Sequence, residues 1–132
     1  MTPGRNRYDE QALMDNRTKG SWGEERAARY LRLRGWRILE RNYRCRFGEI
    51  DLIARRGGTL AFVEVKLRRD DRFAEAREFV GRQKQERILR TAQLYLLQHT
   101  TELQPRFDVI EIYAPDGERG RVRVNHIENA FM

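Results

Sequence analysis

Two neighbouring runs of the chain alternate side chains with the period of a β-strand. Residues 47–54 and 59–67 are apolar at most positions on both faces, so both strands are predicted to lie inside a sheet. Gly57-Gly58 stands between them, and a double glycine between two apolar runs is typical of a two-residue hairpin turn. If Arg56 pairs with Thr59 across that turn, the register of the whole hairpin follows.

The rest of the chain adds two helices and three strands to this hairpin. Apolar residues recur with the helical period of 3.6 in two stretches, and three other short stretches read as strands. The expected elements are helices over residues 21–34 and 74–98, and strands over residues 36–44, 47–54, 59–67, 106–113 and 121–124. Their order, α-β-β-β-α-β-β, predicts an α/β fold in which helices flank a mixed central sheet.

The length of 132 residues is enough for one domain. Residues 1–17 lack a sustained period and are predicted to form a flexible basic arm, which leaves residues 18–132 as a single domain. No stretch is long and apolar enough to span a membrane, and none resembles a signal peptide. The single cysteine, Cys45, excludes an internal disulfide, so we expect a protein of the reducing cytoplasm.

The charge balance narrows the expected partners and metals. Lys and Arg number 27 against 20 Asp and Glu, and the net charge of +7 favours a polyanionic partner such as nucleic acid or an anionic membrane. Neither expected helix pairs a wide apolar face with a basic one, so we expect nucleic acid and no membrane as the partner. Two histidines and one cysteine are too few for a zinc site of the usual kind. We therefore expect any metal to be held by carboxylates, which suit Mg²⁺ or Mn²⁺.

A charged cluster interrupts the two hairpin strands. The register predicts Asp51 directly opposite Glu64, and Glu49 opposite Lys66, with Cβ atoms about 5 Å apart. Two carboxylates at that distance repel by roughly 3 kcal/mol at an effective dielectric of about 20, and a divalent cation would remove the conflict. A shared proton would relieve it too. Alternatively, Lys66 forms an ion pair with Glu49, or Asp51 and Glu64 emerge at a solvated edge.

The first helix offers a further carboxylate, Glu24. It shares a stripe with Ala27, Ala28 and Leu31, and this stripe of small and apolar residues is expected to face the sheet. The alternative role is structural, because Ser21 and Glu24 have the S-x-x-E spacing of a capping box at a helix N-terminus.

Positive side chains accompany this cluster. Lys84 is the one charge in an apolar stripe of the second helix, where its stem either snorkels to solvent or reaches over the sheet to a phosphate. Arg68 and Arg69 directly follow the second hairpin strand, and a basic loop beside an acidic metal site suits a phosphodiester substrate. The alternative is a solvated loop whose charge is balanced by the two aspartates that follow.

An ordered series of motifs resembles the PD-(D/E)xK nuclease superfamily. The series consists of Glu24, then Gly48-Glu49-Ile50-Asp51, then Phe62-Val63-Glu64-Val65-Lys66, with Ile50 where the superfamily name has proline. Together with Gly20-Ser21-Trp22-Gly23, Arg41-Asn42, Lys84 and Arg106-Phe107-Asp108-Val109, the series resembles the bacterial YraN family of uncharacterised proteins. That family is regarded as similar to archaeal Holliday-junction resolvases.

The resemblance implies a restriction-endonuclease-like fold with Glu24, Asp51, Glu64 and Lys66 as its catalytic set. Asp51 and Glu64 would bind Mg²⁺ or Mn²⁺, and Glu24 would bind the metal directly or support a ligand. Lys66 would position or activate the attacking water, or stabilise charge on the phosphate. Lys84 would contact the scissile phosphate.

Two functions follow as hypotheses. The first is a metal-dependent endonuclease that hydrolyses phosphodiester bonds of DNA, with branched or structured DNA in recombination or repair as a candidate substrate. The second is a non-catalytic module on a nuclease fold that binds nucleic acid or docks to a partner protein. The residues do not distinguish DNA from RNA, and a four-way junction as substrate would call for a homodimer.

Overall fold

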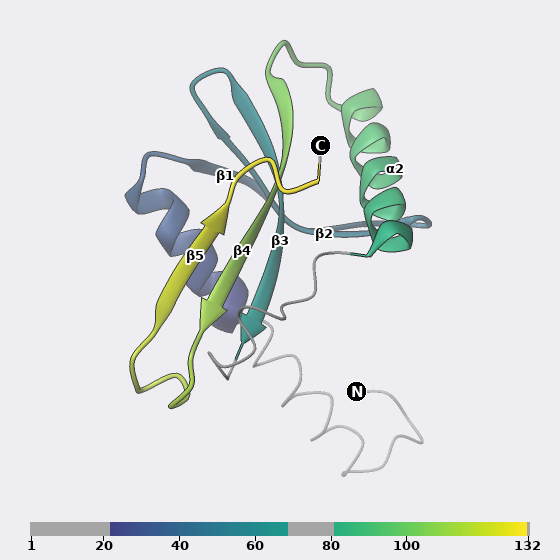
Figure 1. Ribbon diagram of the computed structural model, residues 1–132. Helices are drawn as coiled ribbons and strands as arrows, with labels where there is room; N and C mark the ends of the chain where they lie inside the picture. The colour runs from purple at the N-terminus through teal and green to yellow at the C-terminus, as the bar shows by residue number, and fades with distance from the viewer. Residues whose placement is uncertain (1–21, 69–80, 132) are drawn as a thin grey trace, which may run out of the picture.

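Five strands form one mixed sheet in the order in which they follow one another along the chain (Figure 1). The computed structural model describes residues 22–68 and 81–131. The strands are β1 (Arg37–Cys45), β2 (Gly48–Arg56), β3 (Thr59–Arg68), β4 (Gln104–Tyr113) and β5 (Arg123–Ile127). β3 and β4 are parallel, whereas the other three neighbouring pairs are antiparallel.

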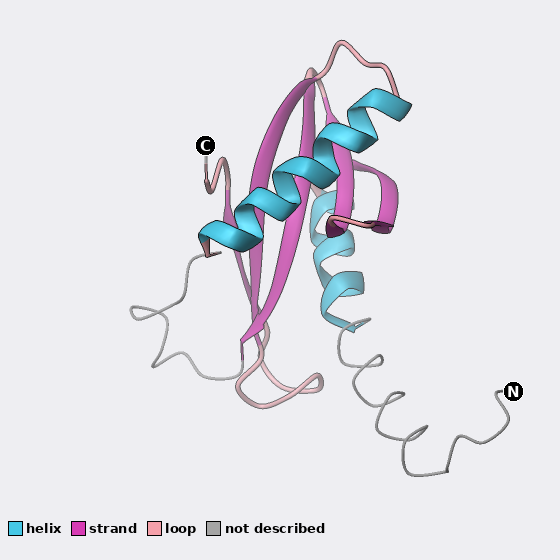
Figure 2. Ribbon diagram, turned by 90° about the vertical axis from the view of Figure 1, so that its right-hand side faces the viewer, coloured by secondary structure: helices cyan, strands magenta, loops and turns pink. Residues whose placement is uncertain are grey.

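One helix covers each face of this sheet (Figure 2). The first helix, residues 22–33, packs closely on one face through the small residues Ala27 and Ala28. On the other face α2 (Arg82–Gln98) packs through an apolar stripe that includes Ile88, and it connects the parallel strands β3 and β4. The predicted α/β fold and the order α-β-β-β-α-β-β are therefore confirmed. Neither described helix combines the length and apolar character that crossing a membrane requires.

The second helix differs from the prediction at its start. The sequence predicted one helix over residues 74–98, but Gly81 has an extended backbone (φ −62°, ψ 158°) and α2 begins at Arg82. Glycine in a helix interior costs about 1 kcal/mol relative to alanine, so a helix that begins after Gly81 avoids this cost. Residues 74–80 and the predicted arm over residues 1–17 lie outside the described residues.

The last strand also differs from the predicted residues 121–124. β5 covers Arg123–Ile127 and pairs with β4 as far as Val109. The prediction stopped too early because β5 continues through polar residues, and it is the pairing with β4 that keeps them extended.

The β2–β3 hairpin has the predicted turn. Arg56 pairs with Thr59 as expected, and Gly57 adopts a left-handed φ of +56° that glycine tolerates without strain. The predicted register holds for five residue pairs, but the ladder ends at the pair formed by Leu52. The predicted pairing of Asp51 with Glu64 thus lies beyond the end of the ladder.

The orientation of β2 changes close to Asp51. Leu52 and Ala54 pack beneath the first helix, whereas Ile50 packs on the face covered by α2. Strict alternation would put Ile50 on the same face as Leu52. The alternation of side chains between the two faces of the sheet is therefore interrupted in this part of β2. The acidic residues of the strand lie at this interruption.

Candidate metal centre

Three carboxylates from two elements meet where β2 leaves the ladder. The first helix contributes Glu24, and β2 contributes Glu49 and Asp51. One ligand oxygen from each of the three lies within 4.8 Å of the other two, and all three residues are half-buried. Carboxylate oxygens in such a group are the ligands that hard cations such as Mg²⁺ and Mn²⁺ prefer. These three residues are called the carboxylate cluster below.

Asp51 bridges the gap between the two hairpin strands. The backbone N–H of Val65 in β3 donates a hydrogen bond of 2.8 Å to Asp51 Oδ2. Among residues 22–68 and 81–131, Val65 is the only hydrogen-bond partner of this carboxylate. The bond orients Asp51 at the end of the ladder but supplies only one of the several donors that a buried carboxylate can accept.

The surroundings of Asp51 make its ionisation costly. Burial, followed by the negative charge of Glu64, raises the pKa of Asp51 to about 7, and the charges of Glu24 and Glu49 act in the same direction. The hydrogen bond from Val65 opposes them only in part. Near neutral pH this group of carboxylates therefore holds a proton or favours a cation in its place.

Glu24 is oriented by Asn42 of β1. Asn42 Nδ2 donates to Glu24 Oε2 at 3.0 Å, and the asparagine backbone has a left-handed φ of +52°. Burial is the main cause that raises the pKa of Glu24, and the bond from Asn42 lowers it again in part. Sequence reasoning assigned no role to Asn42. The available signal was an asparagine inside a strand, where it is disfavoured unless the backbone needs a left-handed residue.

Glu64 lies beside the carboxylate cluster and is paired with Lys84. Glu64 is buried in β3, and its Oε1 atom lies 2.5 Å from Nζ of the half-exposed Lys84 in α2. The structure thus brings Lys84 to the site, as its helix stripe suggested. The expectation that Glu64 is a metal ligand stays a prediction, since its carboxylate lies outside the closest group of three.

The capping role considered for Glu24 depends on Ser21, which lies outside the described residues.

Glu49 and Lys66 do not form the ion pair that was considered as an alternative. Glu49 pairs with Arg44 across β1 and β2, with a nitrogen–oxygen distance of 3.2 Å. Lys66 is half-buried, and within the part of the chain that the structure describes no carboxylate lies within ion-pair distance of it. In the parallel β3–β4 ladder Lys66 is in register with the buried Glu111. Its predicted role at a phosphate stays a prediction.

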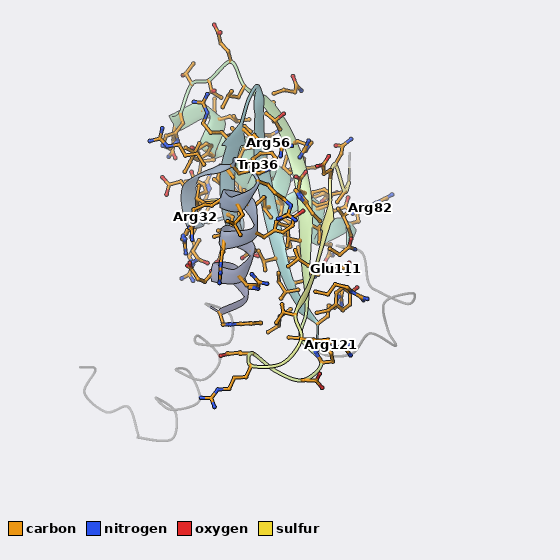
Figure 3. The ribbon with its side chains drawn as sticks, turned by 90° about the vertical axis from the view of Figure 1, so that its left-hand side faces the viewer. Arg32, Trp36, Arg56, Arg82, Glu111 and Arg121 are labelled. Atoms are coloured by element: carbon orange, nitrogen blue, oxygen red, sulfur yellow. The ribbon has the colours of Figure 1, made fainter. Side chains whose placement is uncertain are left out.

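Arg68 and Arg69 were both predicted to contact nucleic acid, and Arg68 is the last residue of β3. Arg68 Nε lies 3.3 Å from Oε2 of Glu111, which also accepts a hydrogen bond of 2.9 Å from Asn125. Glu111 lies on β4 (Figure 3). Arg68 therefore has a structural partner, and its predicted contact with nucleic acid stays a prediction. Arg69 lies outside the described residues.

A second buried acidic group, Asp108, was not singled out as a site. Arg106 donates two hydrogen bonds of 2.9 Å to it, His126 Nε2 lies 2.8 Å away, and the backbone N–H of Asn129 donates at 3.0 Å. Burial alone would raise the pKa of Asp108, but the hydrogen bonds from His126 and Arg106 outweigh it and lower the pKa. This carboxylate joins β4 to His126 and Asn129, and because all its hydrogen bonds are satisfied we infer a structural role for it.

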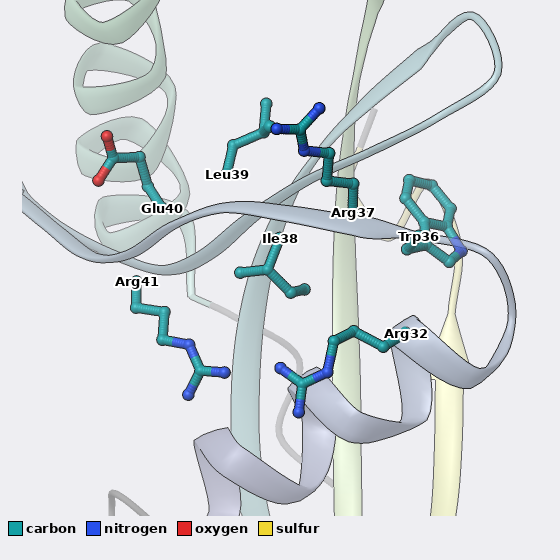
Figure 4. Close-up of a pocket in the computed structure, with 7 residues that line it drawn as sticks. All are labelled: Arg32, Trp36, Arg37, Ile38, Leu39, Glu40 and Arg41. Atoms are coloured by element: carbon teal, nitrogen blue, oxygen red, sulfur yellow. The ribbon is translucent and has the colours of Figure 1, made fainter.

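An open pocket of about 680 Å³ lies elsewhere, between the first helix and β1 (Figure 4). Arg32 and Arg41 point toward each other in it, and both bind Glu25 of the first helix, at 3.1 and 2.5 Å. Glu25 thus offsets part of their charge. The carboxylate cluster does not line this pocket, so this hollow and the candidate chemistry are separate.

The chain is similar to known proteins over most of its length. A family model described as uncharacterised protein family UPF0102 matches residues 23–112. Three UPF0102 proteins illustrate the similarity. That of Symbiobacterium thermophilum is 49% identical over 117 residues, which cover 88% of this chain and 98% of the relative. That of Caldanaerobacter subterraneus is 44% identical over 119 residues (89% and 98%). That of Clostridioides difficile is 42% identical over 119 residues (89% and 100%).

Proposed function

The chain belongs to the UPF0102 (YraN) family, and we propose that it is an endonuclease that hydrolyses phosphodiester bonds of DNA with Mg²⁺ or Mn²⁺. One observation carries the proposal: three carboxylates converge at the end of the β2–β3 ladder, and the Glu64–Lys84 pair adjoins them. Branched or structured DNA is the candidate substrate within this proposal.

The donor set fits a divalent cation. Asp51 carries one backbone hydrogen bond among the described residues, although three other carboxylates raise its pKa. We propose Glu24, Asp51 and Glu64 as the metal-binding residues, and the position of Glu49 adds it to that set. The bound cation would polarise the phosphate and make a water molecule more acidic, the two contributions that phosphodiester hydrolysis needs.

The protein's own side chains supply the rest of the proposed site. Val65 and Asn42 hold Asp51 and Glu24 in place through one hydrogen bond each. Lys66 is available to the phosphate or to the attacking water, because no described carboxylate neutralises it. Lys84, half-exposed beside Glu64, adds a second positive charge for an oxygen of the scissile phosphate.

A cleavage assay tests the proposal. Labelled branched, nicked, duplex and single-stranded DNA are incubated with Mg²⁺ or Mn²⁺ and either the wild type, Asp51→Asn or Glu64→Gln. We expect both substitutions to lower cleavage by about 100-fold or more, because each removes a negative charge from the site. Glu118→Gln changes an exposed carboxylate in the β4–β5 loop and should cleave like the wild type. Equal cleavage by all four proteins would attribute the activity to a contaminant and refute the proposal.

A second candidate function is a module that binds nucleic acid, or docks to a partner protein, without cutting. The observation that favours it is the Lys84–Glu64 ion pair, which satisfies one acidic residue of the site without a metal ion. This candidate predicts that the wild type binds DNA but leaves every substrate in the panel intact with either metal. It also predicts that Asp51→Asn leaves DNA affinity unchanged.

A further inference from the structure

We infer that a basic patch with an aromatic centre, beside the carboxylate cluster, binds a single-stranded segment of nucleic acid and stacks one unpaired base on Phe47. The patch consists of Arg46, Phe47, Arg87 and Arg90 and is called the Phe47 patch below. The inference rests on the proposed function and narrows its substrate to nucleic acid with unpaired nucleotides next to the cleaved bond.

The Phe47 patch lines an open hollow of about 370 Å³ between the β1–β2 turn and α2. The Cζ atoms of Arg46 and Arg90 lie 4.8 and 5.9 Å from the centre of the Phe47 ring. All three arginines are exposed, and within residues 22–68 and 81–131 none of them forms an ion pair. Among the described residues that line the hollow, Glu86 is the only acidic one beside three arginines, so these residues together carry a net positive charge.

The patch adjoins the carboxylate cluster along the chain at the start of β2, and it adjoins the Glu64–Lys84 pair through α2. Phe47 directly precedes Gly48 and Glu49 in the chain. In α2, Lys84 pairs with Glu64, and Arg87, about one helical turn further along, lines the hollow beside Phe47. A Cβ atom on Gly48 would lie 3.5 Å from Arg87 Cβ, so the β1–β2 turn rests against the helix. A strand held on the patch would therefore lead directly toward the carboxylates.

Contacts below the patch hold the turn in place. Thr91 Oγ1 donates to the carbonyl oxygen of Arg87 at 2.7 Å, and Cys45 Sγ lies 3.5 Å from the same hydroxyl. The backbone N–H of Phe47 donates to Cys45 Sγ at 3.4 Å. The aromatic ring is thus presented from a supported turn, which lowers the entropy that binding must overcome.

The residue types favour a single strand over a duplex. Arginines bind phosphates of any nucleic acid, but an aromatic ring gains a stacking partner only where a base face is unpaired and accessible. The guanidinium groups that now lie near Phe47 belong to long exposed side chains, which can turn toward phosphates when a base takes their place. The pocket between the first helix and β1 also has arginines and an aromatic residue, but its Trp36 is buried (4% exposed) and Glu25 binds Arg32 and Arg41.

Binding without divalent metal tests the inference separately from cleavage. Fluorescence anisotropy in EDTA measures the affinity of the wild type, Phe47→Ala, Phe47→Leu and Phe47→Trp for a labelled single strand and for the same sequence as a duplex. Loss of stacking should weaken single-strand binding by about 10-fold in the alanine and leucine variants and change duplex binding by less than about twofold. Phe47→Trp should bind the single strand at least as tightly as the wild type. Phe47→Leu retains apolar packing in the turn, so it separates stacking from folding.

Two matched controls complete the experiment. Leu33→Ala removes an exposed apolar side chain from the first helix and should change neither affinity. Arg90→Ala should weaken both complexes and make them less dependent on salt, whereas Arg121→Ala, in the β4–β5 loop (Figure 3), should have a smaller effect. Equal losses for single strand and duplex in Phe47→Leu, or no loss for either, would overturn the inference. Stacking without any cleavage would retain the Phe47 patch and reject the nuclease proposal.

Discussion

Two aspartates of this protein, the buried Asp108 and the half-buried Asp51, differ in how their charge is satisfied. Asp108 accepts hydrogen bonds from Arg106, His126 and a backbone N–H, and its pKa is lowered. Asp51 accepts one backbone N–H among the described residues, lies near three carboxylates, and has its pKa raised to about 7. The first arrangement stabilises a charge that the fold already contains, whereas the second favours a positive partner that the described part of the chain does not supply.

The raised pKa of Asp51 predicts how the metal-free protein responds to pH. Between about pH 4 and pH 7 folded Asp51 holds a proton that the unfolded chain has released, so the free energy of unfolding falls as pH rises through this window. One such group contributes a slope of at most about 1.4 kcal/mol per pH unit. Urea unfolding in EDTA at several pH values, for the wild type and Asp51→Asn, measures this dependence of the unfolding free energy on pH.

Asp51→Asn should lose this contribution while its amide oxygen still accepts the N–H of Val65. The wild type should therefore lose stability relative to the variant as pH rises from 4.5 to 7.5, at a rate of at most about 1.4 kcal/mol per pH unit. Asp108 contributes with the opposite sign, since its lowered pKa gives stability that is lost only as pH falls below about 4. Parallel profiles for the two proteins across the window would contradict the assigned environment of Asp51.

At the scale of elements, the site forms where regular pairing stops. The sequence predicted the turn at Gly57 and the register of the residues nearest it, because turn chemistry and alternation are local. The end of the ladder was not predictable, because it depends on Asp51 reaching the backbone of Val65 and on β2 changing face at Ile50. The result is a cluster that includes Glu49, which the predicted register had placed opposite Lys66.

The same distinction between local patterns and long-range contacts explains which features of the other elements were predicted. Glu24 and Lys84 were located correctly by helical stripes, since a period of 3.6 identifies the face that meets the sheet. Asn42 was missed because its contact joins residues far apart in the chain, and α2 was predicted too long because periodicity outweighed Gly81.

The network around Asp108 predicts a large effect on stability. Asp108→Ala leaves the guanidinium of Arg106 partly buried without its main partner, and breaking a buried pair costs about 3–5 kcal/mol. Urea unfolding measures this loss. Glu128→Ala removes a more exposed partner of Arg106, at 3.6 Å, and should cost less than about 1 kcal/mol. Similar losses in both variants would contradict the structural role given to Asp108.

On the scale of the whole molecule, the sheet brings together groups that belong to its opposite layers. The first helix supplies Glu24 from one face, and α2 supplies Lys84 from the other (Figures 1 and 2). The chain has 24 arginines and only three lysines. Two of these lysines lie in the described residues, Lys66 on β3 and Lys84 on α2, and both elements border the acidic residues of the site. The basic surface and the acidic cluster thus combine attraction for a polyanion with a place for a cation.

Calorimetric titration with Mn²⁺ tests the carboxylate cluster most directly, because it requires neither a substrate nor cleavage. A metal centre in this cluster predicts saturable binding at pH 7.5 to the wild type and to Glu118→Gln, whose changed residue lies in the exposed β4–β5 loop. It predicts at least about a 10-fold weaker association for Asp51→Asn, which keeps the shape of the side chain but removes its charge. Equal Mn²⁺ affinity in all three proteins, or no binding to any of them, would contradict the assignment of a metal centre to Glu24, Glu49 and Asp51.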